Sequence, residues 1–181
     1  MTIRRITEIG NPVLRMTSLP VAEDDFGTEP LMGFVQDLVD TMRDYEGVGI
    51  AAPQVGVPAR IFAIEVRVPD ADRDAQQFPL TIVMNPELEL LEERVHPGWE
   101  GCLSVEGLRG VVLRARHARL TGRSASGAPV DLELTGFPAV VAQHENDHLD
   151  GLVYLDRMPD LLSLATVREL ARRVPAVADP E

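Results

Sequence analysis

The segment from Phe137 to Leu149 constrains the fold of this chain more than any other. Its apolar residues and histidines recur at helical spacing between Gly136 and Gly151, which predicts a helix over 137–149. Within it, His144 and His148 are four residues apart, so their imidazoles lie on one helix face and can converge on one metal ion. We therefore expect the rest of the chain to pack around this helix.

The remaining segments carry a mixture of helical and strand patterns. Apolar residues at helical spacing predict a first helix over 28–47 and a last helix over 160–173. Short segments rich in β-branched residues predict strands at 59–66, 80–84, 87–95, 108–116, 117–123 and 130–135. Residues 124–127 are expected to form a hairpin turn, and 69–79 a surface loop.

Helices and strands do not alternate regularly, which favours an α+β fold over a doubly wound α/β fold. We expect antiparallel β-sheets packed around a central helix that carries the two histidines, with an N-terminal helix and a C-terminal helix. The 181 residues contain no repeat or linker, so we expect a single domain over 1–181 with a frayed tail at 174–181.

Composition excludes several classes of function. The net charge of −12 argues against direct nucleic-acid binding. All 17 basic residues are arginine, so Schiff-base chemistry and a Walker-type lysine are excluded. No apolar run approaches the roughly 18 residues of a membrane helix, and the first residues do not resemble a secretory signal, so we expect no membrane association and a cytoplasmic protein.

The pattern His-Glu-x-x-His is suited to metal-assisted hydrolysis. The histidines bind the metal, while Glu145 serves as general base and then general acid for a metal-bound water. Two residues are candidates for the third ligand that such a site requires: the single cysteine, Cys102, and Glu169. The pattern alone is also compatible with buried structural histidines, and a lone cysteine is often a small buried hydrophobe.

A glycine-rich segment at 47–56 is the other unusual feature of the sequence. Its glycines permit close approach of the backbone to a ligand, and Gln54 can direct an amide N–H at an oxygen that becomes negative. The segment lacks the lysine and the hydroxyl residue of a phosphate-binding loop, and it follows a predicted helix, so nucleotide binding is not expected.

Taken together, these segments resemble the motifs of peptide deformylases. The family patterns G-x-G-[LI]-A-A-x-Q, E-G-C-L-S and Q-H-E-x-D-H-L-x-G stand here at 47–54, 100–104 and 143–151. The segment 10–15 is similar to the N-terminal pattern of the family, and the resemblance extends to about Met158.

The resemblance implies a role for each matching residue. Cys102, His144 and His148 would bind the metal, in preference to Glu169. Metal-bound hydroxide would attack the formyl group of N-formylmethionyl nascent peptides, with Glu145 as the proton shuttle. The side chain of Gln54 and the backbone N–H of Leu103 would stabilise the oxyanion. The family commonly uses Fe(II) and accepts Zn, Ni or Co.

The resemblance also implies a substrate site. The methionine side chain would enter a pocket formed by Val48, Phe137, Val140 and Val141, and the substrate backbone would pair with the segment around Gly49. Glu100 and Arg109 are assigned to the same substrate site. An enzyme of this kind is expected to work near the ribosome, and the last predicted helix carries three arginines, Arg168, Arg172 and Arg173.

Two departures from the family pattern affect the expected activity. Glu106 replaces a usual proline close to Cys102, and Leu113 replaces a frequent proline. Glu106 adds negative charge where a peptide would pass. These departures leave a catalytically weak metal-binding module of the same fold as an alternative to a deformylase. A second alternative is a small metallopeptidase that uses Glu169 as its third metal ligand.

Overall fold

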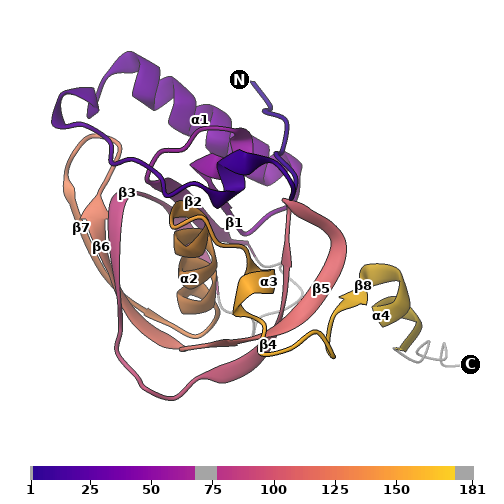
Figure 1. The fold of residues 1–181 in the computed structure, drawn as a ribbon. Helices are drawn as coiled ribbons and strands as arrows, with labels where there is room; N and C mark the ends of the chain where they lie inside the picture. Colours follow the sequence, from indigo (N-terminus) through magenta and orange to yellow (C-terminus); the bar gives the residue numbers. More distant parts are fainter. Residues whose placement is uncertain (1, 68–76, 174–181) are drawn as a thin grey trace, which may run out of the picture.

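Two antiparallel sheets enclose a helix in the computed structural model, which describes residues 2–67 and 77–173 (Figure 1). The five-stranded sheet has the order β1 (Gly49–Ala51), β2 (Ile61–Val66), β3 (Phe78–Leu90), β6 (His117–Arg123) and β7 (Pro129–Thr135). The three-stranded sheet has the order β4 (His96–Cys102), β5 (Val105–Arg114) and β8 (Ala165–Thr166). The helices are α1 (Glu29–Asp44), α2 (Phe137–Leu149), α3 (Tyr154–Arg157) and α4 (Val167–Arg173), with 3-10 turns η1 (Pro12–Arg15), η2 (Glu23–Asp25) and η3 (Ala52–Val55).

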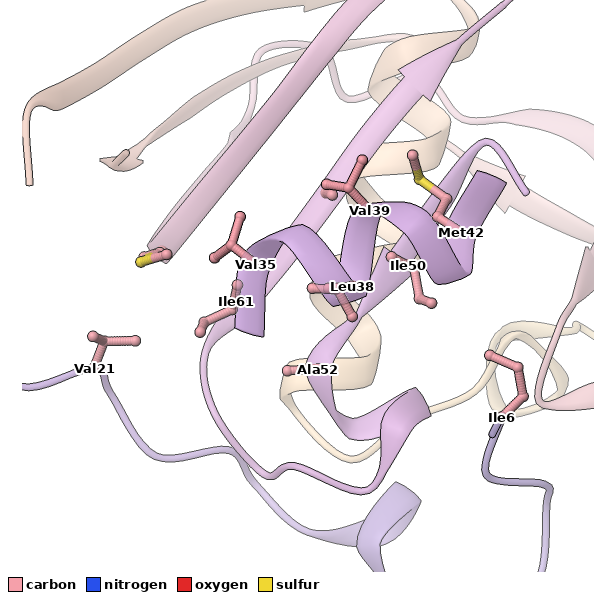
Figure 2. Close-up of a cluster of buried hydrophobic side chains, with 11 residues drawn as sticks. Ile6, Val21, Val35, Leu38, Val39, Met42, Ile50, Ala52 and Ile61 are labelled. Carbon is pink, nitrogen blue, oxygen red and sulfur yellow. The ribbon is translucent and has the colours of Figure 1, made fainter. Parts of the chain in front are cut away.

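Strand β2 is buried on both faces and separates two hydrophobic clusters. Ile61 and Ala63 point to the side covered by α1, and Phe62 and Ile64 point to the side covered by α2. On the first side, α1 contributes an apolar stripe that packs on β1 and β2 (Figure 2). That cluster contains Ile6, Val21, Val35, Leu38, Val39, Met42, Ile50, Ala52, Ile61, Ala63 and Met84.

Helix α2 lies against the opposite face of the five-stranded sheet (Figure 1). Its residues Ala139, Val141, Ala142 and Leu149 join the second cluster, so one face of the helix is fixed to this sheet. A third, smaller cluster lies under β5 and contains Val105, Val112, Val153 and Tyr154. The other face of α2, with its histidines, is thereby held toward β4 and β5.

The expected α+β architecture is confirmed, including the central helix at 137–149 and the strand at 117–123. The strands predicted at 80–84 and 87–95 correspond to one long strand, β3, which ends at Leu90, so the predicted continuation over 91–95 is wrong. Its register shifts between Met84 and Glu87, where Asn85 has a φ of 49°. Three strands were not predicted: β1, β4 and β8. The segments 68–76 and 174–181, which include most of the expected loop and the expected tail, lie outside the described residues.

The predicted C-terminal helix is confirmed, but its predicted start at residue 160 is wrong, because α4 begins only at Val167. The residues before it pair with β5: Thr166 stands opposite Leu108, and the Ser163 hydroxyl accepts a hydrogen bond from the N–H of Val111 at 3.0 Å. Tertiary pairing with a sheet edge therefore overrides the local helical spacing. Among the described residues, no helix has the length and apolar character needed to cross a bilayer.

Candidate metal centre and active site

Three side chains from two elements converge beside α2. The ligand atoms of Cys102, His144 and His148 all lie within 4.8 Å of one another, and Cys102 Sγ is 3.2 Å from His148 Nε2. Cys102 ends β4, next to the tight turn at Leu103 and Ser104 that leads into β5. The helix repeat places the two imidazoles edge to face with ring centroids 5.1 Å apart, and the turn brings the thiol to them.

This donor set fits a metal ion. A thiolate and two imidazoles bound tetrahedrally at about 2.0 to 2.3 Å stand about 3.3 to 3.8 Å apart, a spacing compatible with the observed cluster. His144 Nδ1 lies 2.8 Å from a carboxylate oxygen of Glu100, which leaves Nε2 as the metal-binding atom. His148 directs its Nε2 at Cys102. Cys102, His144 and His148 are the residues that would hold the ion.

Glu100 belongs to a buried chain of charges behind His144. Arg114 donates to both carboxylate oxygens of Glu100 at 2.8 and 3.1 Å, and to Asp147 at 2.6 Å. Arg157 closes the chain by donating to Asp147 at 2.7 Å. Burial alone would raise the pKa of Glu100, but hydrogen bonds from His144 and Arg114 outweigh it and lower the pKa to about 2. Glu100 is therefore ionised and orients His144.

Glu145 is almost completely buried between α2 and β1. Its Oε2 has no hydrogen-bond partner among the described residues, and its carboxylate lies against the backbone of Gly49. Burial is the main cause that raises the pKa of Glu145 to about 7, with the charge of Glu100 acting in the same direction and His144 opposing it. A carboxyl group with this pKa can both accept and return a proton near neutrality.

Gln54 reaches the cluster from η3. Its Oε1 accepts a hydrogen bond from the N–H of Ala51 at 2.7 Å, and its Nε2 donates toward Cys102 Sγ at 3.4 Å. The amide N–H groups are thereby directed at the metal site. Leu103 follows Cys102 directly, and its side chain packs close to Gly47. The two predicted oxyanion donors therefore flank the predicted ligands.

A cavity of about 300 Å³ opens beside the cluster. Its lining includes Trp99, Glu100, Val112, Arg114, Phe137 and Val140. Of the four residues expected to form the methionine pocket, Phe137 and Val140 line this cavity. Val141 instead lies in the core cluster on the other side of α2, and Val48 packs against that same cluster.

The remaining predicted residues lie outside the metal-binding cluster of the described residues. The Arg109 side chain passes over Gly101, since a Cβ there would lie 3.4 Å from Arg109 Cγ. Glu106 is exposed at the start of β5. Glu169 is exposed on α4 and pairs with Arg172, and it does not belong to the metal-binding cluster of the described residues. The side chain of Arg168 is exposed as well.

Several residues at the site were not predicted from the sequence. Arg114 and Asp147 form the charged chain behind Glu100, and Trp99 and Val112 line the cavity. The Tyr154 ring stacks on His144 with a centroid distance of 6.3 Å. Asp147 lies inside the helix motif and could have been singled out as a charged residue on an inward helix face. Trp99, Val112 and Arg114 depend on the pairing of β4 with β5, and Tyr154 comes from α3.

Comparison with known proteins agrees with this geometry. The family model described as polypeptide deformylase matches residues 3–163. Peptide deformylase 1 of Nitrosomonas europaea is 42% identical over 159 residues, which cover 88% of this chain and 89% of the relative. Peptide deformylase 1 of Prochlorococcus marinus is 40% identical over 171 residues, covering 94% and 88%.

Solved structures give the same result. The class I type b peptide deformylase of Acinetobacter baumannii superposes with a TM-score of 0.81 at 31% identity, covering 87% of this chain and 99% of that chain. The peptide deformylase of Thermotoga maritima gives a TM-score of 0.76 at 32% identity, covering 88% and 100%. With its family match, its relatives and its fold in agreement, this chain belongs to the peptide deformylase family.

Proposed function

We propose that this enzyme hydrolyses the formyl group of N-formylmethionyl peptides at the Cys102, His144 and His148 centre, with Glu145 as proton carrier. The observation that carries this assignment is the convergence of the three ligand atoms within 4.8 Å, directly beside a buried carboxylate. When bound, the metal supplies Lewis acidity and lowers the pKa of water. Glu145 accepts the proton of the attacking water and delivers it to the α-amine as formate leaves.

The surrounding residues stabilise this reaction by their positions. The Gln54 amide and the Leu103 N–H would donate hydrogen bonds to the formyl oxygen as it becomes negative. Glu100 holds His144 by a 2.8 Å contact, and Arg114 holds Glu100 in turn. The site is thus ordered by the protein before the substrate arrives.

The substrate is proposed to run from the cavity to the open edge of β1. The methionine side chain would occupy the 300 Å³ cavity between Trp99, Phe137 and Val140. The peptide backbone would pair beside Val48 and Gly49 as an added strand, near the Arg109 side chain. A relative from Acinetobacter baumannii, with a TM-score of 0.80 and 32% identity, has been crystallised with Met-Ala-Ser bound, which supports a short methionyl peptide as the ligand.

We propose Fe(II) as the metal in the cell, with zinc, nickel or cobalt as substitutes. The thiolate and imidazole ligands by themselves suit zinc equally well. Metal analysis of protein purified without oxygen would distinguish iron from zinc.

A cytoplasmic location and transient proximity to the ribosome are part of the same proposal, since the substrates are new polypeptides. The exposed Arg168 of α4 is compatible with a contact to the ribosome and equally with a solvated helix face. Cosedimentation of the protein with ribosomes at low salt would test the proximity.

Formate release from formyl-Met-Ala-Ser tests the function against its two alternatives. A deformylase releases formate and leaves Met-Ala-Ser intact, and Glu145→Ala abolishes the reaction. A metallopeptidase would cleave the peptide between its residues, and Glu169→Ala would then remove its metal. A protein with full metal content that does neither would be a binding module.

A further inference from the structure

The segment just before η1 connects the two loops that carry the predicted oxyanion donors. The N–H of Thr7 donates a hydrogen bond to the carbonyl of Gln54 at 2.8 Å, and the N–H of Ile9 donates to the carbonyl of Ser104 at 2.8 Å. Gln54 and Ser104 are distant in the sequence and belong to different elements. Figure 1 shows this first part of the chain, in indigo, passing the start of β5.

Each hydrogen bond acts on the backbone at an oxyanion donor. The first holds the main chain of Gln54, whose side-chain amide lies 3.4 Å from Cys102 Sγ. The second holds the tight turn that contains Leu103, because Ser104 is its second residue. The separation between the two donors therefore depends on one short piece of chain.

This segment is fixed by a buried side chain before the two hydrogen bonds and by a turn that encloses Ile9. Ile6 precedes them and is 6% exposed, buried in the cluster under α1. Around Ile9, the N–H of Asn11 donates to the carbonyl of Glu8 at 3.1 Å, and Gly10 has a φ of 103°. A turn closed in this way, with a positive φ at its third residue, is a type II turn. The segment is thus fixed well enough to hold the two loops.

We propose that Thr7 and Ile9 are positioning residues for the oxyanion site, acting through their backbone N–H groups. The inference rests on the roles of Gln54 and Leu103 in the proposed function. Hydrogen bonds that stabilise a transition state depend on donors held at fixed positions before the reaction, and misplacement by about 1 Å costs up to roughly 10²-fold in rate. Thr7 and Ile9 set the positions of those donors by holding the backbone of Gln54 and Ser104.

The substitution Ile9→Pro removes one of these N–H groups and places a ring carbon in its position, so it pushes the Ser104 carbonyl away as well as removing its hydrogen-bond donor. Ile9 is the second residue of the type II turn, a position that proline favours. Proline has no N–H, so the hydrogen bond to Ser104 is lost while the turn is retained. The Ile9 side chain is 45% exposed, and Ile9→Ala is the matched control because it shortens the side chain and keeps the N–H.

The test measures kcat and KM for formate release from formyl-Met-Ala-Ser by the Ni(II) enzyme, together with metal content and the absorption spectrum of the Co(II) form. We expect Ile9→Pro to lower kcat about tenfold with KM within about twofold of the parent, because the oxyanion forms only in the transition state. Metal content and the Co(II) spectrum should stay unchanged. Ile9→Ala should remain within about twofold of the parent in both constants.

A folded Ile9→Pro variant with the kcat of Ile9→Ala would overturn the inference, as would a fall in kcat explained by lost metal. If the proline variant does not fold, the α-hydroxy acid analogue of isoleucine at position 9, which replaces the N–H by an ester oxygen, applies the same test. If the unmodified enzyme released no formate, the proposed function itself would be contradicted.

Discussion

The backbone of Gly49 in β1 lies directly against the side chain of Glu145 in α2. A Cβ at position 49 would lie 2.8 Å from Cδ and 2.9 Å from Cγ of Glu145, closer than packed carbon atoms approach. Because the carboxylate is buried and enclosed, it cannot move aside without leaving its position at the metal site. Glycine at 49 is therefore a requirement of the proton carrier as well as of the expected substrate pairing.

Gly49→Ala should lower kcat by at least about tenfold while the protein keeps its metal, because displacement of Glu145 disturbs proton transfer. Steady-state kinetics and metal analysis of the purified variant check this. Gly33→Ala is the control: Gly33 is in α1, with no atom within 4 Å of its Cβ position. That variant should keep full activity and gain about 0.5 to 1 kcal/mol in unfolding free energy. Unchanged activity of Gly49→Ala would show that the enzyme does not depend on the observed position of Glu145.

Gln54→Ala should lower kcat on the order of 10² to 10³-fold without loss of metal, since it removes one oxyanion donor. The same substitution leaves the N–H of Ala51 without its acceptor, so we expect a modest loss of stability as well. Kinetics at a temperature well below the unfolding midpoint separate the two effects. Gln36→Ala, at an exposed position of α1, controls for loss of an amide. A kcat close to that of the parent would remove Gln54 from the mechanism.

Arg114→Met should destabilise the protein by about 3 to 5 kcal/mol, because it leaves Glu100 and Asp147 buried without their shared partner. Urea unfolding of the parent and the variant measures this difference. The control is Arg119→Met, which breaks an exposed pair with Asp131 and should have little effect. Equal effects of the two substitutions would mean that the buried chain of charges is not important for stability.

Glu65→Gln should reduce stability in a pH-dependent manner. Two hydrogen bonds from Arg43, each 2.8 Å long, lower the pKa of Glu65 below its usual 4.5, although burial opposes them. A lowered folded-state pKa stabilises the protein above about pH 4.5, and this contribution is lost as the pH falls from there through the folded-state pKa.

The expected loss for Glu65→Gln at pH 7 is about 0.5 to 1 kcal/mol, because Arg43 is 39% exposed and the pair is screened by solvent. Urea unfolding at pH 7 and below pH 4.5 should show the difference shrinking toward zero. Glu87→Gln, at an exposed position of β3, controls for removal of a carboxylate charge. A difference that grows on acidification would contradict the sign of the pKa shift.

The sequence predicted the helices and strands that have a clear periodicity of apolar or β-branched residues within their own segment. Helix α2 and strand β6 have the predicted bounds, and α1 begins one residue later and ends three residues earlier than predicted. Strand β4 was missed because its segment contains Pro97 and Gly98 and little β-branched character. It forms because β5 pairs with it along its length, which sequence periodicity does not reveal.

The same distinction applies to the site. Spacing alone indicated His144, Glu145 and His148, because one helix places them together. The sequence pattern did not decide whether Cys102 or Glu169 is the third metal ligand. That choice depends on the turn between β4 and β5, which brings Cys102 to the histidines. The chain of charges through Arg114 could not be predicted from the sequence either, because the partners of Arg114 come from β4 and α2.

The most direct test of the account is to measure metal content and formate release together for Glu145→Gln, loaded with Ni(II) beside the unmodified enzyme. Glutamine preserves the shape of the side chain and removes its ability to carry a proton. We predict full metal content and a fall in formate release on the order of 10² to 10⁴-fold. A metal-loaded variant that releases formate at close to the parent rate would contradict the central claim that Glu145 is the proton carrier of this metal centre.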